Sequence, residues 1–303
     1  MNILQNEHWS IGILPETGGA LVYGRILRGG GWVDFLRPTP TADYATSAKC
    51  ASYVLLPWSN RLRAAKFRFL DKEYTLQVNY KDGTAIHGVA KDYAWRVDHA
   101  EPQRLRLSFR SDEHNDVNFP FRFSGVQEFT LEGGTFSLYT SVKNEDARPM
   151  PAGFGHHPYF VRKMGADPAR LEIPCPLVYE LEDNLPSAGP VPLTEERLDF
   201  RQMKTLAPEN YKLLIDDLFT GHTPEQPVRF AYGDTEIHLR AGALYKHIVL
   251  YAPADKPFFA LEPVTNANDG FNLHAQGISA ANVFVLQPGE EKAETFSLNI
   301  IQA

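Results

Sequence analysis

Cysteine is scarce in this chain, which has only Cys50 and Cys175 in 303 residues. The two lie far apart, and neither belongs to a paired metal-ligand spacing, so the sequence supports neither a disulfide framework nor a zinc site. We expect both to be free thiols in a reducing compartment, and the expected location is therefore cytoplasmic.

Long hydrophobic runs are also missing. No apolar stretch reaches the roughly 18 residues of a membrane span, and Met1 to Gly12 lacks the basic start and the cleavage site of a signal peptide. Positive charge is in deficit, because 30 Lys and Arg stand against 37 Asp and Glu and give a formal net charge of −7. We therefore expect neither nucleic acid nor a membrane as a partner.

Several catalytic signatures are absent. The chain has no Gly-x-Ser-x-Gly elbow of a serine hydrolase, no Gly-x-Gly-x-x-Gly of a Rossmann unit and no His-x-x-x-His pair. Although it has ten histidines, no compact ligand set indicates a metal. We expect neither a metal nor an organic cofactor.

What the sequence does have is alternation of apolar and polar residues. In Arg104–Arg110 the alternation is strict and puts Leu105, Leu107 and Phe109 on one face of a half-buried strand. The pattern recurs around Gly133-Gly134, which predicts a hairpin turn. Other strand-like segments are Tyr74–Val78, Val228–Tyr232, Glu236–Leu239, His247–Tyr251, Phe258–Leu261, Val283–Leu286 and Thr295–Ile301. The sequence therefore predicts an all-β fold.

Two stretches interrupt the strand pattern. Pro208 to Asp216 has the spacing of a short helix, and the proline-rich stretch from Pro174 to Pro192 predicts a long surface connection. A domain boundary in the proline-rich stretch is the alternative. Because the strand patterns on its two sides are alike and no Gly/Ser linker separates them, we expect a single domain over 1–303.

Polar residues that can carry chemistry are concentrated at predicted strand ends, a common way to build a site on a rigid sheet. The four segments are Leu56–Leu62, Ala85–Gly88, Gly153–Phe160 and Phe258–Pro263. Each has an ordinary alternative: Glu262 as a structurally paired carboxylate, for example, and His87 as a turn residue. Adjacent histidines on an extended chain point to opposite faces, so we expect His156 or His157 to be a spectator.

Taken in order, these segments resemble the galactose mutarotase or aldose 1-epimerase family over nearly the whole chain. The segments that carry the resemblance are Gly18-Gly19-Ala20-Leu21, Asn60-Arg61-Leu62, His87-Gly88 with Trp95, His156-His157-Pro158-Tyr159-Phe160, Asp216-Asp217-Leu218-Phe219, Leu261-Glu262-Pro263 and Leu286-Gln287-Pro288-Gly289-Glu290. The resemblance implies a twisted antiparallel β-supersandwich with a small-molecule sugar in an open cleft. It also implies a mutarotase, which interconverts the α and β anomers of a free aldose.

The resemblance implies roles for individual residues. Glu262 matches the catalytic base, His157 the catalytic acid and His87 a second active-site histidine. The positions that match sugar-binding residues are Asn60, Arg61 and one of the neighbours Asp216 and Asp217. The loop after Glu262 departs from its form in the galactose enzymes, so the resemblance does not extend to a preference for galactose.

The chemistry of anomer exchange accounts for these residue types. A base must take the O1 proton while an acid protonates ring O5, and each positioned transfer contributes roughly 10²–10⁴-fold. Apolar neighbours of Glu262 predict partial burial and a raised pKa of its carboxyl. Trp58, Tyr159 and Phe271 are candidates for stacking on the sugar, with core packing as the alternative for each.

Two other functions stay open. The stretch from His87 to Lys91 is similar to the His-Gly-Phe-Ala-Arg form of hexose-6-phosphate epimerases, and cations able to meet a phosphate are Arg61, Arg63, Lys66 and Lys91. The second alternative is a carbohydrate-binding module that keeps the cleft without catalysis. Comparing glucose with glucose 6-phosphate separates the first, and sugar binding without faster anomerisation would indicate the second.

Overall fold

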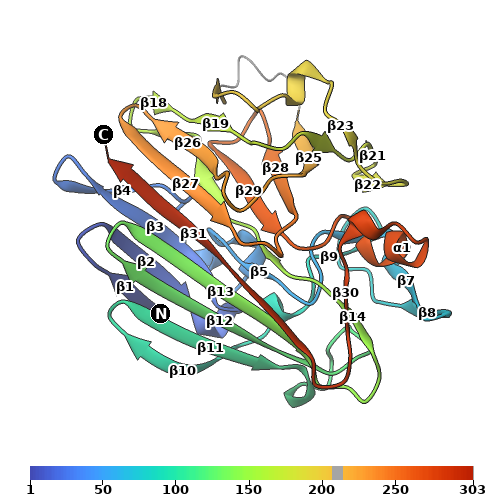
Figure 1. Ribbon diagram of the computed structural model, residues 1–303. Coiled ribbons are helices and arrows are strands. Elements are labelled where there is room, and N and C mark those ends of the chain that lie inside the picture. The colour runs from blue at the N-terminus through green and yellow to red at the C-terminus, as the bar shows by residue number, and fades with distance from the viewer. Residues whose placement is uncertain (207–213, 303) are drawn as a thin grey trace.

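The computed structural model describes residues 1–206 and 214–302, which form antiparallel sheets of very different sizes (Figure 1). The all-β prediction is confirmed. The largest sheet in the described residues has nine strands, in the order β10-β11-β12-β13-β31-β27-β26-β19-β24. Its strands are β10 (Arg96–Glu101), β11 (Arg104–Arg110), β12 (Phe123–Glu132), β13 (Thr135–Asn144), β19 (Arg170–Glu172), β24 (Lys204–Thr205), β26 (Val228–Tyr232), β27 (Thr235–Ala241) and β31 (Glu291–Gln302).

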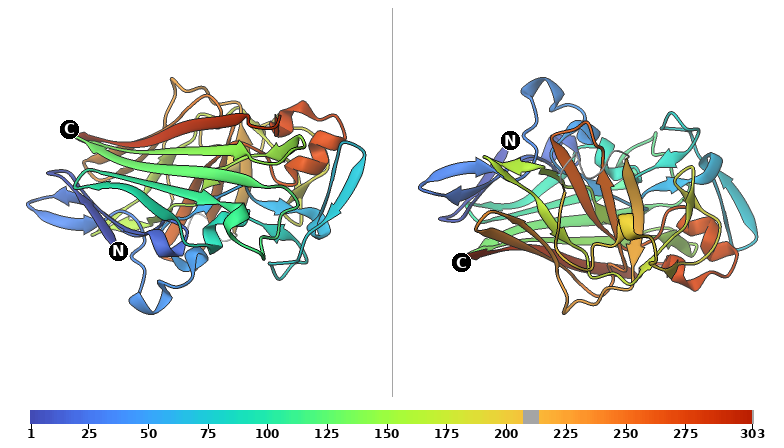
Figure 2. Two further views of the ribbon diagram at one scale, coloured as in Figure 1. Left: turned by 90° about the horizontal axis from the view of Figure 1, so that it is seen from below. Right: turned by 90° about the horizontal axis from the view of Figure 1, so that it is seen from above.

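The second large sheet has eight strands within the described residues, in the order β23-β20-β25-β28-β29-β15-β5, with β16 also paired to β29. Its strands are β5 (Val54–Leu55), β15 (Gly155–His156), β16 (Tyr159–Val161), β20 (Leu177–Val178), β23 (Val191–Pro192), β25 (Ile215–Thr220), β28 (His247–Ala252) and β29 (Phe258–Val264). Both views of Figure 2 show β25 and β28, in orange, crossing the long green strands β12 and β13 at a steep angle. The two sheets therefore pack as crossed layers.

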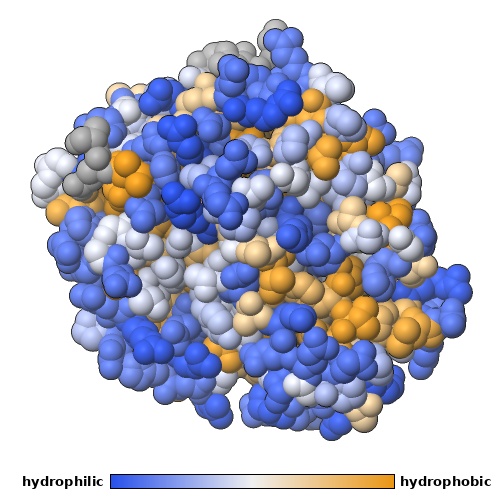
Figure 3. Space-filling view, in the orientation of Figure 1, coloured by the Kyte–Doolittle hydropathy of each residue, from blue (hydrophilic) through white to orange (hydrophobic). Residues whose placement is uncertain are grey.

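Alternation in the sequence explains the nine-stranded sheet. Along β12 buried and partly exposed residues alternate, and the turn Gly133-Gly134 joins it to β13 with Glu132 opposite Thr135, as predicted. Hydrophilic residues cover most of the sheet's outer face, whereas hydrophobic residues gather toward β7 and β30 (Figure 3). The inner face supplies the core, because the apolar half of each strand turns toward the second sheet.

The eight-stranded sheet is covered on both faces. On one face Phe259 and Leu261 of β29 belong to the large core shared with the nine-stranded sheet, and on the other Ala260 belongs to a second buried cluster with Leu218 and Val249. Every residue of β29 after Phe258 is therefore buried. A polar side chain of β29 on the second face is therefore shielded from bulk solvent.

The remaining strands form small sheets at the periphery of the described residues. An N-terminal sheet contains β1 (Asn2–Gln5), β2 (Trp9–Leu14), β3 (Ala20–Arg28) and β4 (Gly31–Asp34). The two-stranded pairs are β6 (Arg61–Leu62) with β9 (Ala85–Ile86), β7 (Lys66–Phe69) with β8 (Lys72–Thr75), β14 (Met150–Ala152) with β30 (Phe284–Leu286), β17 (Lys163–Met164) with β18 (Asp167–Pro168), and β21 (Leu181–Glu182) with β22 (Leu185–Pro186).

Helices are short. The α-helix of the described residues is α1 (Gly270–Ala275). The 3-10 turns are η1 (Pro15–Thr17), η2 (Thr41–Asp43), η3 (Ser47–Lys49), η4 (Arg63–Ala65), η5 (Ala90–Asp92), η6 (Ser111–Glu113), η7 (Glu196–Leu198) and η8 (Ser279–Ala281). No helix in the described part of the chain is long and apolar enough to cross a membrane.

Two local predictions need correction or limits. The strand expected at Tyr74–Val78 is instead β8, which ends at Thr75, because the amides of Leu76 and Gln77 donate to Ala65 and to the side chain of Asn118. The helix expected at Pro208–Asp216 falls mainly on 207–213, outside the described residues, and Asp216 itself lies in β25.

The proline-rich stretch is more than a surface connection. Within it, β20 pairs with both β23 and β25 and extends the eight-stranded sheet. Pro192 stands on β23, the outermost strand of that sheet, where its missing N–H costs no ladder bond.

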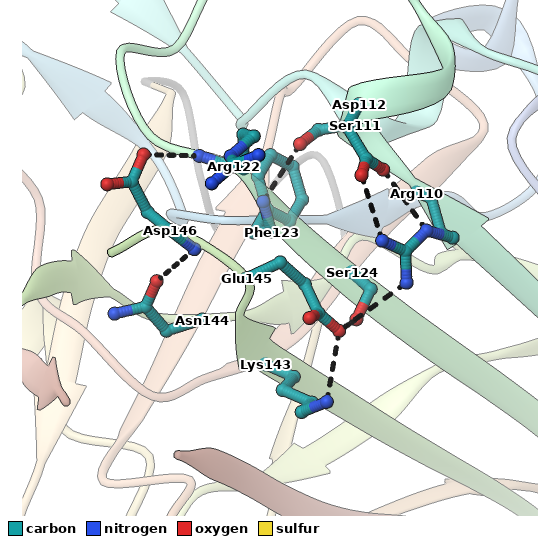
Figure 4. Close-up of polar contacts among 10 residues, drawn as sticks. All are labelled: Arg110, Ser111, Asp112, Arg122, Phe123, Ser124, Lys143, Asn144, Glu145 and Asp146. Carbon is teal, nitrogen blue, oxygen red and sulfur yellow. Dashed lines mark hydrogen bonds and ion pairs between the residues drawn. The ribbon is translucent and has the colours of Figure 1, made fainter. Parts of the chain in front are cut away.

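Polar contacts close one end of the nine-stranded sheet (Figure 4). Glu145, just beyond β13, accepts a hydrogen bond from Ser124 of β12 at 2.8 Å and pairs with Lys143 at 3.2 Å and with Arg110 at 3.6 Å. The lateral edge of the sheet next to β11 is β10. All residues of β10 are exposed, and its register with β11 shifts between Val97 and His99. The outer edge is thus irregular, whereas the middle of the sheet is regular.

Candidate active site

A cavity of about 320 Å³ lies over the second face of the eight-stranded sheet. Its wall contains six of the predicted site residues, which come from separate parts of the chain: Asn60, Arg61, His87, His157, Asp216 and Glu262. The volume is at the small end of the range of about 300–1,000 Å³ for small-molecule pockets. The cavity therefore suits a small polar ligand.

The register of three central strands decides which carboxylates face the cavity. Asp216 of β25 pairs with Tyr251, which pairs with Ala260 of β29, and Glu262 is two residues further on. Side chains on a strand alternate, so Asp216 and Glu262 share a face. Asp217 points the other way, is absent from the cavity wall and lies 3.8 Å from Arg197.

Two short strands bring the Asn-Arg pair beside His87. Arg61 pairs with Ile86 in the ladder of β6 and β9, and the amide of His87 donates to the carbonyl of Asn60 at 2.9 Å. Asn60 and His87 both have positive φ, 56° and 64°, a backbone region that asparagine and histidine adopt more readily than most residues. Such conformations concentrate at functional sites.

Gly88 locks this corner to the segment before it. Its backbone lies against Leu56, so a Cβ atom at Gly88 would collide with the Leu56 carbonyl, and the amide of Val89 donates to that carbonyl at 2.8 Å. The φ of Gly88, 64°, also favours glycine. The close packing of Gly88 on Leu56 thus fixes the backbone position of His87, the residue before it.

The two adjacent histidines have separate environments. His156 turns into the core, where its Nε2 lies 2.6 Å from the hydroxyl of Thr140, and it does not line the cavity. His157 lines the cavity and is held through its amide, which donates to the carbonyl of Tyr53 at 3.0 Å. Of the two histidines, His157 therefore faces the cavity and His156 does not.

Glu262 and His157 form a buried pair. Nε2 of His157 lies 3.0 Å from Oε1 of Glu262, and the two residues are 6% and 2% exposed. Burial raises the pKa of Glu262 well above its usual value, with the charge of Asp216 adding to the rise, and burial lowers the pKa of His157 to about 3. Both shifts favour a neutral carboxylic acid beside a neutral imidazole, one proton transfer away from carboxylate and imidazolium.

Some buried polar atoms of the site lack partners among the described residues. They are Oε2 of Glu262 and the Nδ1 atoms of His87 and His157. Burial lowers the pKa of His87 far below its usual value, and the neighbouring His157 and Lys91 lower it further, so its imidazole is neutral. Buried polar atoms are normally satisfied, so these positions suit a ligand that supplies hydrogen bonds.

Cations of the site are already neutralised. Arg61 donates from Nε to Asp82 at 2.9 Å, and Nζ of Lys91 lies 2.6 Å from Asp92. Arg63 and Lys66, also considered as phosphate ligands, line a different hollow between β7 and α1. Burial raises the pKa of Asp216 to about 6, against the opposing charge of Arg61. The site therefore presents acceptors and paired cations, a poor match for a phosphate group.

Aromatic residues of the site were the hardest to foresee. Tyr53, Tyr80 and Tyr251 line the cavity, and no motif in the sequence marks them among the 13 tyrosines. Of the aromatic candidates named from the sequence, Tyr159 lines the cavity, whereas Trp58 and Phe271 are buried in the core against each other, at 6.4 Å between ring centres. Within the described residues no group of three or more His, Cys, Asp and Glu has the arrangement of a metal site.

Comparison with known proteins gives one family profile over nearly the whole chain. The family profile described as aldose 1-epimerase matches residues 5–299. The uncharacterized protein YphB of Escherichia coli K12 is 27% identical in an alignment 321 residues long, which covers 99% of each chain.

Solved structures share the fold. A galactose mutarotase-like protein from Clostridium acetobutylicum superposes with a TM-score of 0.87 at 20% identity, over 99% of this chain and 95% of that one. The GalM/aldose epimerase homologue from C. elegans gives 0.82 at 17% identity, over 100% and 98%. Since the family match covers almost every residue and the fold agrees, the chain belongs to the aldose 1-epimerase family.

Proposed function

We propose that the protein is a mutarotase that interconverts the α and β anomers of a free aldose. The observation that carries the proposal is the spacing of 3.0 Å between Oε1 of Glu262 and Nε2 of His157 at the cavity wall. Ring opening moves one proton off O1 and another onto O5, and both oxygens are bonded to the same carbon. An acid and a base this close together can serve both oxygens at once.

In this mechanism the pair supplies one mobile proton. Transfer from the Glu262 carboxyl to His157 gives a carboxylate, which takes the O1 proton, and an imidazolium, which protonates O5 as the C1–O5 bond breaks. The aldehyde end then rotates, and closure on its other face returns both protons along the same paths. The chain's own residues thus complete the cycle, and the proton count of the site is the same before and after.

The remaining groups suit a neutral monosaccharide. Asp216 accepts from sugar hydroxyls, while Asn60 and Arg61 donate, and His87 contacts the same end of the ring. We prefer a free aldose to a hexose 6-phosphate because Arg61 and Lys91 already have carboxylate partners. The free, buried thiols of Cys50 and Cys175 support a location in the reducing cytoplasm.

Polarimetry tests the proposal. The protein is expected to accelerate the equilibration of α-D-glucose or α-D-galactose over the spontaneous rate at low buffer concentration, and glucose 6-phosphate is expected to respond less. A faster response to the phosphate would favour the hexose-6-phosphate epimerase. Sugar binding by calorimetry without any acceleration would favour a carbohydrate-binding module.

The pH dependence of KM provides a second test. Because the pKa of Asp216 is about 6, its carboxyl is charged above that pH and becomes neutral below it. A hydrogen bond to a charged acceptor is stronger, so KM is expected to rise roughly tenfold as the pH falls from 7 to 5. The variant Asp216→Asn should have a high KM that stays flat over this range, while Asp217→Asn should keep the pH dependence. A flat KM in the wild type would contradict the role of Asp216.

A further inference from the structure

The imidazole of His157 is oriented in an unusual way. Catalytic histidines are commonly fixed by a hydrogen bond at the nitrogen remote from the reaction. Here Nδ1 has no partner among the described residues, and Nε2 faces Glu262 and, at 3.5 Å, the hydroxyl of Tyr159. The ring packs instead against two tyrosines, with its centre 4.9 Å from that of Tyr53 and 4.4 Å from that of Tyr159.

The side chain of Arg37 packs against Tyr159 on the side away from His157, and the mechanism above gives it no role. The guanidinium carbon of Arg37 is 4.0 Å from the ring centre of Tyr159 and 4.6 Å from that of Phe258. Its Nη2 donates to the carbonyls of Lys49 and Cys50, at 2.8 and 2.7 Å. Arg37 is partly buried, and among the described residues its guanidinium forms no ion pair with a carboxylate within 4 Å.

Resting on the proposed function, we propose that Arg37 and Tyr159 are positioning residues for the catalytic His157. Arg37 holds the ring of Tyr159 through its face, and Tyr159 in turn packs on the imidazole and keeps its hydroxyl beside Nε2. When a sugar separates Nε2 from Glu262, this hydroxyl is the contact that keeps the imidazole aimed at the cavity. By holding Tyr159, Arg37 orients the imidazole indirectly, a task that a hydrogen-bond partner at Nδ1 has in other sites.

The charge of Arg37 has a second effect in the same direction. Burial lowers the pKa of His157 most, and Arg37 is the charged group that lowers it further. An imidazolium formed there gives up its proton readily, which suits an acid that must act and recover in each cycle. The titratable and charged groups that share the cavity with His157 are Tyr53, Arg61, Tyr80, His87, Lys91, Tyr159, Asp216, Tyr251 and Glu262.

Four variants test the inference. Tyr159→Phe keeps the ring and loses the hydroxyl, Arg37→Met keeps much of the length and loses the charge, and Arg37→Lys restores the charge. Arg25→Met is the control for loss of an arginine over a tyrosine ring: Arg25 lies 4.7 Å over the ring of Tyr23 and also pairs with Asp34, and neither Arg25 nor Tyr23 lines the cavity.

Kinetics of aldose equilibration give the first readout. Tyr159→Phe is expected to lower kcat about tenfold, the effect of one hydrogen bond to a group that becomes charged, with little change in KM. Arg37→Met should move the acidic limb of the kcat profile to higher pH, and Arg37→Lys should move it back. Arg25→Met should do neither.

The imidazole ¹⁵N resonances of His157, assigned by their loss in His157→Gln, give a readout that needs no activity. They are expected to shift in Tyr159→Phe and Arg37→Met at constant pH and to stay in place in Arg25→Met. Unchanged resonances in both site variants would overturn the inference. A wild type that accelerates no aldose would overturn the proposed function, and the resonances would still decide the positioning role.

Discussion

Replacing Glu262 by glutamine is expected to reduce the enzymatic acceleration of anomer exchange by roughly 10²–10⁴-fold, the contribution of one positioned proton transfer. The amide has almost the same shape as the carboxyl and can still hydrogen-bond to His157, but it cannot accept the O1 proton. The measurement is the initial polarimetric rate at saturating sugar, corrected for the spontaneous reaction.

The same substitution separates catalysis from folding. Burial raises the pKa of Glu262, so charging it costs free energy that the neutral amide does not incur. Glu262→Gln should therefore keep the wild-type unfolding midpoint in urea. Glu294→Gln is a suitable control, because Glu294 accepts hydrogen bonds from the amides of Leu244 and Thr295 and does not line the cavity. More than a tenth of wild-type activity in Glu262→Gln would contradict the assigned base.

Among the variants considered, Gly88→Ala is expected to lower the free energy of unfolding most. The added methyl group would meet the backbone of Leu56, which cannot move aside as a flexible side chain can, and alanine would also have to adopt a φ of 64°. A positive φ alone costs roughly 1–2 kcal/mol, and overpacking typically costs roughly 1–3 kcal/mol more. Activity should fall as well, because His87 is the adjacent residue.

Gly83→Ala isolates the conformational cost. Gly83 has a φ of 82° but no atom within 4 Å of the position of its missing Cβ. Urea unfolding should show a loss of roughly 1–2 kcal/mol for Gly83→Ala and at least about 1 kcal/mol more for Gly88→Ala. Equal losses in the two variants would mean that the contact with Leu56 yields easily.

The fold was largely predictable because alternation reports directly on burial. β11 has the bounds expected from the pattern, as does β26. The β7–β8 hairpin was less accessible, since its turn residues Leu70 and Asp71 adopt positive φ without a glycine to mark them. Turn conformations of this kind depend on tertiary contacts as well as on local sequence.

The charged residues that line the cavity could be named from the sequence, whereas most of the tyrosines that line it could not. Carboxylates and histidines at strand ends are rare enough to be noticed, whereas nothing in the sequence distinguishes Tyr53, just before β5, or Tyr251 of β28 from other tyrosines. The choice between Asp216 and Asp217 depends on the pairing of β25 with β28, which one chain's sequence does not specify. Register turns each pair of neighbours into one residue that faces the cavity and one that does not.

The exposed edge strand β10 has a consequence for how the protein behaves at high concentration. An open strand edge is a template for pairing with another molecule, and the largest sheet of this fold ends in one. The charges of Arg96, Asp98 and Glu101, together with the register shift after Val97, make that edge a poor template. The same irregularity that interrupts the ladder therefore protects the chain against edge-to-edge aggregation.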